Sequence, residues 1–263
     1  MMRDWSQYTP AQMRRAIRQG EYQGPTAGLC MCFAQCNLIA LPKALAYDFL
    51  LFAQRNSRAC PVLEVSDAGS RRLEWLAQDL DLARDFPRYR LYEQGELAGE
   101  YTDAEALWRP DLVSFLIGCS FSFEGALLEA GLPVRHIEQG RNVPMYRTNI
   151  PCRPAGAFYG NMVVSMRPMT PAQAIRAANV TAAMLRVHGA PIHLGDPSAL
   201  GIRDIDRPDY GDPVELRSGE IPVFWPCGVT PQNVVTQAKP PFAVTHAPGH
   251  MLITDIPNSG LKD

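Results

Sequence analysis

The sequence lacks the features that mark a nucleic-acid-binding, secreted or membrane protein. Its 25 basic and 27 acidic residues form no long run of like charge and give a formal net charge of −2. The N-terminus has no apolar segment typical of a signal peptide. The longest apolar stretch, residues 27–53, is interrupted by polar and charged residues. We therefore expect a cytoplasmic protein that binds a small molecule, with no nucleic-acid or membrane partner, and homo-oligomer formation stays open.

The chain has seven cysteines, an odd number. This count favours free thiols in a reducing compartment over a disulfide framework. Cys30, Cys32 and Cys36 lie close together, but their spacing fits no common zinc signature. We expect structural thiols here.

A second group of metal-binding residue types occurs near the C-terminus, at His246, His250 and Asp255. Pro248-Gly249 separates the two histidines and excludes the helical i, i+4 geometry of zinc motifs. A histidine beside an apolar strand is more often a structural residue. We therefore predict no metal site and no other cofactor.

The segment from Leu112 to Pro133 predicts a strand, a tight turn and a helix. An apolar run ends at Gly118, small polar residues follow, and Gly131 with Pro133 ends the helix. Such a turn directs backbone N–H groups and the positive end of a helix dipole to one place, which suits an anion. The candidate site residues on it are Gly118, Cys119, Ser120, Ser122 and Glu124.

Residues 221–232 repeat this pattern, with Cys227 and Gly228 in the turn, Thr230 as the predicted N-cap and Pro231 at the first helical position. Two such junctions in one sheet would bring two helix N-termini to the same edge, which strengthens the case for an anionic ligand. Capping boxes at 9–12 and 170–173 predict two further helix starts.

Residues 141–152 are rich in side-chain donors. The fork of an arginine matches a carboxylate, so Arg141 and Arg147 could clamp one, with Tyr146 and Asn149 beside them. A solvated arginine loop is the competing interpretation. Downstream, a strand over 190–194 delivers His193 and Asp196 to its carboxyl end, where open α/β sheets place ligands.

Two polar residues, Gln35 and Asn37, stand inside the apolar run before residue 40. They are either site residues or side chains that satisfy backbone groups in a buried segment. The sequence does not decide between these roles.

Strand and helix patterns alternate and predict a mixed α/β fold. The predicted helices include one over 71–82, and the core strands lie near 61–66, 112–118, 221–227 and 250–256. We predict a three-layer α/β/α core domain from residues 1–139 and 213–263. A smaller two-layer α+β domain, residues 140–212, would be inserted into it, with the site in the cleft between them.

Several of these segments together resemble the hydro-lyase, or D-glutamate cyclase, family. They cover nearly the whole chain: Gln35–Leu38, Leu41-Pro42, Phe115–Glu124, Asn142–Asn149, Met162–Pro168, His188–Pro191, Gly195–Pro197, Cys227–Pro231, Thr245-His246 and Pro248-Gly249. The resemblance implies an enzyme that removes water from a small acid. In characterised members this reaction closes D-glutamate to 5-oxo-D-proline.

This chemistry needs a carboxylate clamp, an oxyanion site, a base and an acid. Our hypothesis assigns the clamp to Arg147 and Arg141, and the oxyanion site to the N–H groups after Gly118 and Gly228. The acid and base candidates are Glu124, Asp196 and His246. The other substrate-binding candidates are Tyr146, Asn149, Ser122, His193, Cys227 and Thr230.

Two other functions stay open. Residues 118–122 are one glycine short of the G-x-S-x-G nucleophile elbow, so Ser120 could attack an acyl group. Cys119 at a helix N-terminus is an equal candidate. The protein could also bind a small carboxylate without turning it over.

Overall fold

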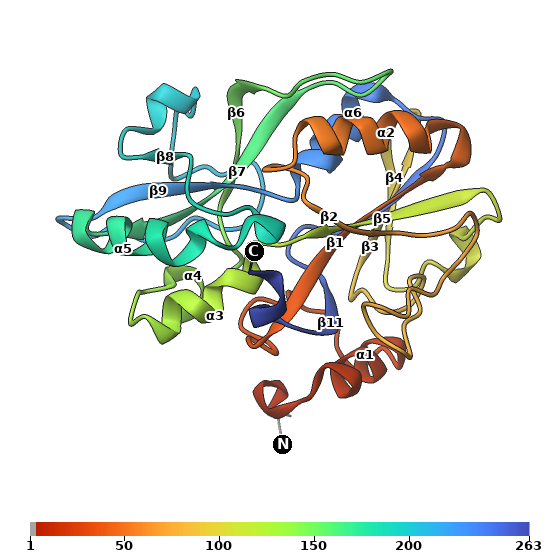
Figure 1. Cartoon of the computed structure of the whole chain (residues 1–263), viewed down its shortest axis with the longest axis horizontal. Coiled ribbons are helices and arrows are strands. Elements are labelled where there is room, and N and C mark those ends of the chain that lie inside the picture. The colour runs from red at the N-terminus through yellow and green to blue at the C-terminus, as the bar shows by residue number, and fades with distance from the viewer. Residues whose placement is uncertain (1–3, 263) are drawn as a thin grey trace.

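The computed structural model describes residues 4–262 and confirms a mixed α/β fold (Figure 1). The helices are α1 (Pro10–Arg18), α2 (Lys43–Arg55), α3 (Phe121–Glu129), α4 (Arg135–Glu138), α5 (Pro171–Ala182) and α6 (Thr230–Ala238). The strands are β1 (Phe33–Pro42), β2 (Val62–Val65), β3 (Tyr89–Glu93), β4 (Glu96–Tyr101), β5 (Leu112–Gly118), β6 (Met145–Pro151), β7 (Asn161–Met169), β8 (His193–Leu194), β9 (Ile221–Pro226), β10 (Ala243–His246) and β11 (Leu252–Pro257). Within the described residues no helix combines the length and apolar character needed to cross a membrane.

The strands form two separate sheets in which the neighbouring strands run antiparallel. The seven-stranded sheet has the order β2-β5-β1-β10-β3-β4, with β11 also paired to β1. The four-stranded sheet has the order β6-β7-β9-β8. In Figure 1 the smaller sheet lies on the left with α3, α4 and α5, and the larger sheet lies on the right.

Apolar side chains cover both faces of the large sheet. On one face α2 and α6 pack on β1 and β5, for example through Phe49, Phe115 and Val234. On the other face the covering residues come from the irregular segment 73–86. The small sheet packs α3 and α5 against Trp225 on one face. Its other face is covered by the chain around residues 200–214.

The helix predicted over 71–82 is wrong, because this segment forms successive turns. Its periodic leucines are buried as in the predicted helix: Leu73, Leu76 and Leu80. However, the carbonyl of Arg71 accepts the N–H of Leu82 at 2.9 Å, and Arg71 forms an ion pair with Asp81. The ends of a helix of this length would be about 18 Å apart. The segment therefore closes on itself and buries its leucines as a loop.

Two of the predicted helix caps are confirmed by the structure. Thr9 and Thr170 form the predicted capping boxes with Gln12 and Gln173. The predicted N-cap at Thr230 is wrong, because α6 begins at this residue and Val229 is the N-cap, without a side-chain bond.

The strand near 221–227 pairs with β7 and β8 and not with the core strands beside which the sequence placed it. Its residues Val223 and Trp225 supply the apolar surface on which α3 and α5 pack, so the small sheet needs them. The division into a core domain and a domain inserted at 140–212 stays a prediction.

Candidate active site

The two strand-to-helix junctions singled out in the sequence meet, although they belong to different sheets. One follows β5 at Gly118 in the large sheet, and the other follows β9 at Cys227 in the small sheet. Asn37 on β1 joins them. Its Nδ2 donates to the carbonyl oxygens of Ile117 and Gly118 at 3.1 and 2.9 Å, and its amide contacts Gly228. The expectation that both junctions lie in one sheet is therefore wrong, but their proximity is confirmed.

Glycine is required in both turns because the neighbouring chain approaches too closely for a side chain. A Cβ at Gly118 would lie 2.1 Å from the carbonyl oxygen of Arg186, and a Cβ at Gly228 would lie 2.0 Å from Nδ2 of Asn37. Both distances are far below van der Waals contact. The turns thus pack closely on other parts of the backbone and on Asn37.

The turns also leave backbone donors unused. Within the described part of the chain, the N–H groups of Cys119, Ser120 and Gly228 have no hydrogen-bond acceptor. The thiols of Cys119 and Cys227 belong to one apolar cluster, which places the two turns side by side. This arrangement offers several N–H groups for an anion or a developing oxyanion.

Beneath the first turn lies a buried ion cluster that centres on Glu124. Arg167 donates to Oε1 of Glu124 from Nε at 3.1 Å and from Nη2, and Nε2 of His136 lies 3.0 Å from the same oxygen. Arg167 also donates to the hydroxyls of Ser120 and Ser165, at 3.1 Å each. All five side chains are buried. The cluster therefore ties the first turn to β7 of the other sheet.

The ion cluster keeps Glu124 charged. Burial raises the pKa of this carboxyl, but His136 and Arg167 together lower it by more, so the pKa lies below its ordinary value. A carboxylate of this kind holds its partners better than it donates a proton. The geometry consequently supports a positioning role for Glu124 more than the general-acid role.

The thiols and hydroxyls of the turns lack the partners that a nucleophile needs. Burial raises the pKa of Cys119 well above its ordinary value and that of Cys227 to about 11, so both stay protonated. The hydroxyl of Ser120 is bonded to Arg167, and no histidine or carboxylate accepts its proton within the described residues. An acyl-transfer mechanism is therefore less well supported than a binding role for this turn.

The polar side chains next to these turns bond to backbone groups. Ser122 Oγ accepts the N–H of Gln35 at 2.9 Å. Thr230 Oγ1 donates to the carbonyl of Cys227 at 2.7 Å and accepts the N–H of Val163 at 3.1 Å. Gln35 Nε2 itself donates to the carbonyls of two residues in the preceding loop, Thr26 and Leu29. Gln35 and Asn37 thus satisfy buried backbone groups, one of the two roles left open by the sequence.

A cavity of about 310 Å³ opens where the two sheets adjoin, and we call it the arginine pocket. Its lining includes Arg88, Arg90, Glu100, Asn142, Asp209, Tyr210 and His250. The arginines and Glu100 come from β3, β4 and the residue before β3. Asn142 and Tyr210 come from the chain on either side of the small sheet. Tyr210 also packs against the apolar cluster that contains Cys119 and Cys227.

The two arginines of the pocket already hold a carboxylate. Arg90 Nε donates to Oε1 of Glu100 at 2.7 Å, and Arg88 Nη1 lies 3.6 Å from Oε2. Burial raises the pKa of Glu100, but Arg90 and Arg88 together lower it below its ordinary value. Because residues i and i+2 of a strand share a face, Arg88 and Arg90 point the same way. Both arginines of the pocket are therefore paired with a carboxylate of the chain itself.

Arg147 borders the pocket from outside. Its Nε and Nη2 donate to the hydroxyl of Tyr210 at 3.3 and 3.0 Å, and its guanidinium lies 5.4 Å from the centre of the Tyr210 ring. The side chain is exposed. Arg147 can therefore add positive charge at the mouth, while Tyr210 separates it from the interior.

Three other candidates from the 141–149 segment hold a loop. Arg141 donates to the carbonyl of Pro213 at 2.5 Å, Tyr146 to that of Ile205 at 2.6 Å, and Asn149 to that of Ala199 at 3.3 Å. None of the three lines the arginine pocket. Their donors are used to fix the chain between β8 and β9.

His193 and Asp196 bond within their own loop and are not brought to the pocket. Nε2 of His193 lies 2.7 Å from the carbonyl oxygen of Asp196, and the carboxylate of Asp196 caps the short helix at Pro197–Leu200 through Ser198. Asp196 is exposed. The prediction failed to place these residues because β8 runs antiparallel to β9, so the rule for open parallel sheets does not apply.

His246 is buried in the large sheet. Its Nδ1 accepts the N–H of Leu38 at 3.1 Å, which puts the proton of the neutral ring on Nε2, and Nε2 has no partner within the described residues. Burial lowers the pKa of His246 to about 3. This imidazole therefore stays neutral and sealed, and the geometry does not support it as the base.

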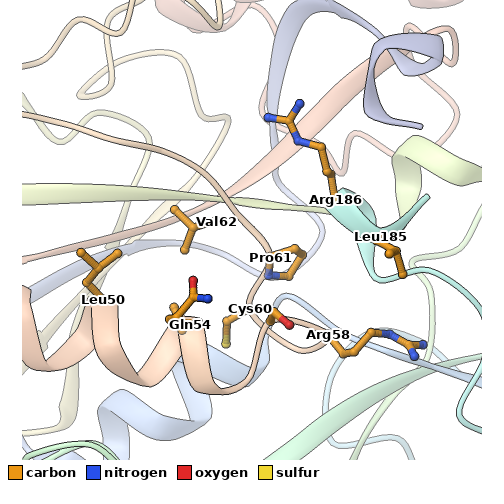
Figure 2. Close-up of a pocket in the computed structure, with 10 residues that line it drawn as sticks. Leu50, Gln54, Arg58, Cys60, Pro61, Val62, Leu185 and Arg186 are labelled. Carbon is orange, nitrogen blue, oxygen red and sulfur yellow. The ribbon is translucent and has the colours of Figure 1, made fainter. Parts of the chain in front are cut away.

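A second cavity of similar volume lies between α2, the loop after it and the short helix Leu185–Val187 (Figure 2). Its two arginines are already engaged: Arg58 donates to the carbonyls of His188 and Ala190, and Arg186 lies over the ring of Trp75. Figure 2 shows both side chains extending away from Leu50 and Gln54. None of the residues singled out in the sequence lines this cavity.

Four residues were not identified from the sequence as candidates for the site: Arg88, Arg90, Asn142 and Arg167. Arg167 stands alone in the apolar strand Met162–Met169, and an isolated charge in a central strand signals a buried partner. Arg88 and Arg90 form an alternating pair that predicts one shared face, and Asn142 begins the donor-rich segment. Within residues 4–262 no group of three histidine, cysteine or carboxylate residues could hold a metal ion.

The chain is similar to known proteins over nearly its whole length. The family model for D-glutamate cyclase matches residues 113–255. A protein named "Putative hydro-lyase" from Clostridium beijerinckii is 61% identical over 98% of this chain and 99% of its own. Similar relatives from Methylobacterium sp. and Stutzerimonas stutzeri are each 59% identical, over 97% and 94% of this chain and 95% and 94% of theirs. The chain therefore belongs to the D-glutamate cyclase family.

Proposed function

We propose that the protein is a hydro-lyase that removes water from a small carboxylic or amino acid bound in the arginine pocket. The first substrate to test is D-glutamate, which would close to 5-oxo-D-proline. The observation that carries this proposal is the pair Arg88 and Arg90, which already hold a carboxylate in a cavity at the junction of the two sheets. Family membership gives the reaction type.

The pocket suits a small acid in both volume and charge. Its volume of about 310 Å³ lies at the lower end of the range for ligand sites, roughly 300–1,000 Å³. Three arginines line or border it against two carboxylates, Glu100 and Asp209, which leaves a formal charge of +1. A substrate with two carboxylates and one ammonium carries a net charge of −1, so its charge is complementary to that of the pocket.

The proposal assigns the remaining parts of the reaction to the two turns. The free N–H groups of Cys119, Ser120 and Gly228 would stabilise the oxyanion that forms when the amine attacks the side-chain carboxyl group. Glu124 and Arg167 hold the first turn in place. Arg147 would attract the acid to the mouth, because its guanidinium is exposed.

The test is to incubate the purified protein with D-glutamate, L-glutamate and a panel of hydroxy and amino diacids, and to follow loss of water by mass spectrometry. Arg90→Ala should raise KM for the active acid about 10- to 100-fold, because a charge-assisted hydrogen bond contributes roughly 1.5–3 kcal/mol. Arg109→Ala is the matched control, since Arg109 pairs with Asp111 on the surface. It should leave KM unchanged.

Two results would overturn the proposal. If no acid of the panel loses water, but D-glutamate still raises the melting temperature, the protein is a carboxylate-binding module. If a serine- or thiol-directed probe labels Ser120 or Cys119 and stops turnover, the acyl-transfer alternative is correct.

A further inference from the structure

His250 differs from the other four histidines because it lines the arginine pocket and its Nε2 has no hydrogen-bond partner within the described residues. His250 lines the pocket in the turn between β10 and β11 and is partly exposed. Its Nδ1 lies 3.0 Å from the carbonyl oxygen of Pro248. No partner within the described residues bonds to Nε2, and this nitrogen is not among the buried unpartnered atoms.

The hydrogen bond to Pro248 decides which ring nitrogen carries the proton. A carbonyl oxygen can only accept, so Nδ1 must donate, and the neutral ring then has its lone pair on Nε2. Burial lowers the pKa of His250, so the neutral form predominates at physiological pH. Nε2 is therefore ready to take a proton from a bound acid.

The remaining histidines cannot serve in this way. Nε2 of both His188 and His246 is buried without a partner, His136 contacts Glu124, and His193 bonds to its own loop. Glu124 is also unsuited, because Arg167 and His136 hold its charge. This leaves one imidazole with a free acceptor nitrogen in the pocket that holds the carboxylate clamp.

We infer that His250 is the proton-transfer residue of the site, and that its Nε2 takes a proton from the substrate ammonium and passes it to the departing oxygen. This inference rests on the proposed function.

The step balances for an amino diacid such as glutamate. The nitrogen forms a bond to the side-chain carboxyl carbon, one carbon–oxygen bond of that carboxyl breaks, and the oxygen leaves as water. The ammonium loses two protons in becoming an amide, and the departing oxygen gains two. One imidazole can therefore carry both protons in turn, without another acid or base.

The charged groups around His250 come from three segments. Arg88 and Arg90 lie on and before β3, Glu100 lies on β4, and Asp209 with Tyr210 lies in the loop before β9. The two arginines lower the pKa of His250, and Glu100 raises it by a smaller amount. Bringing a substrate carboxylate into the pocket would add a second group that raises this pKa.

The experiment compares His250→Asn with His250→Ala in the full chain, using the acid that the wild type dehydrates. Asparagine has an amide N–H close to the place of Nδ1, so it can keep the bond to Pro248 while losing the base. We expect kcat to fall at least 100-fold in both variants, with KM changed less than threefold. Imidazole added to His250→Ala should restore turnover, with more rescue as the pH rises.

The outcomes separate this inference from the proposed function. If the wild type turns over an acid and His250→Asn retains more than a third of the wild-type kcat, the inference about His250 is wrong. The proposed function would still stand. A loss that occurs only in His250→Ala and is not rescued by imidazole would show a structural role. Absence of turnover in the wild type with every acid would overturn the proposed function instead.

Discussion

Acid should destabilise this protein well above the pH at which carboxylates titrate, because two buried histidines must stay neutral in the folded state. Burial lowers the pKa of His188 to about 4 and that of His246 to about 3. Both rings are fully buried. In the unfolded chain a histidine has a pKa of about 6.5. Below that pH the unfolded state binds protons that the folded state does not.

The sign and size follow from proton linkage. Because the folded pKa of each histidine is depressed, stability is complete above about pH 6.5 and falls as the pH drops toward the folded values. At about pH 5 the solution is about 1.5 pH units below the pKa of a histidine in the unfolded chain. At about 1.36 kcal/mol per unit, each histidine then lowers the free energy of unfolding by roughly 2 kcal/mol. The two together should lower the free energy of unfolding by about 4 kcal/mol. This is a large part of a typical stability of about 5–15 kcal/mol.

The assay is urea unfolding followed by circular dichroism at pH 7.5, 6.5 and 5.0. The wild type should lose about 4 kcal/mol between pH 7.5 and 5.0, and His246→Gln should lose about half of that. The depressed pKa of Glu124 acts only below about pH 4.5 and does not enter this range. A wild type whose unfolding free energy changes by less than about 1 kcal/mol over this range would refute the reasoning.

Two further predictions concern the junction of the sheets. Arg167→Met should lower the free energy of unfolding by about 3–5 kcal/mol, because it removes one of the two cationic partners of the buried Glu124 carboxylate. Urea titration should show a smaller loss when Glu124→Gln is added. Gly228→Ala should cost about 1–3 kcal/mol, because its Cβ would lie 2.0 Å from Asn37, and a thermal melt should show that Asn37→Ala relieves part of this cost. Gly260→Ala, which meets nothing closer than 3.8 Å, is the control.

The sequence predicted those helices and turns whose ends are marked by capping residues or by glycine. The capping boxes at Thr9 and Thr170 and the glycine turn after β5 could be predicted because neighbouring residues make the bonds. The 71–82 segment could not, because its leucine spacing suits a helix as well as a series of turns. The ion pair between Arg71 and Asp81 and the bonds that close this loop become visible only in three dimensions.

In the candidate site, too, the sequence predicted the local features and not the contacts between distant segments. The two turns were identified from sequence, but the residues that join them, Asn37 and Arg167, reach across from other strands. Arg141 and Asn149 have the chemistry of ligand-binding residues, yet they bond to backbone carbonyls. Residue type thus indicates what a side chain can bind, whereas sheet topology decides which partner it meets.

Where the two sheets adjoin, a buried ion cluster and a partly exposed pocket lie in different places. The ion cluster around Glu124 engages all three nitrogens of Arg167 and fixes the first turn. The arginine pocket lies outside this cluster, and the carboxylate of Glu100 in it is only partly buried. A substrate carboxylate that displaces Glu100 would keep Arg90 paired throughout. Under the proposed function, binding would then exchange one ion pair for another, which would favour an acid over a neutral ligand of the same shape.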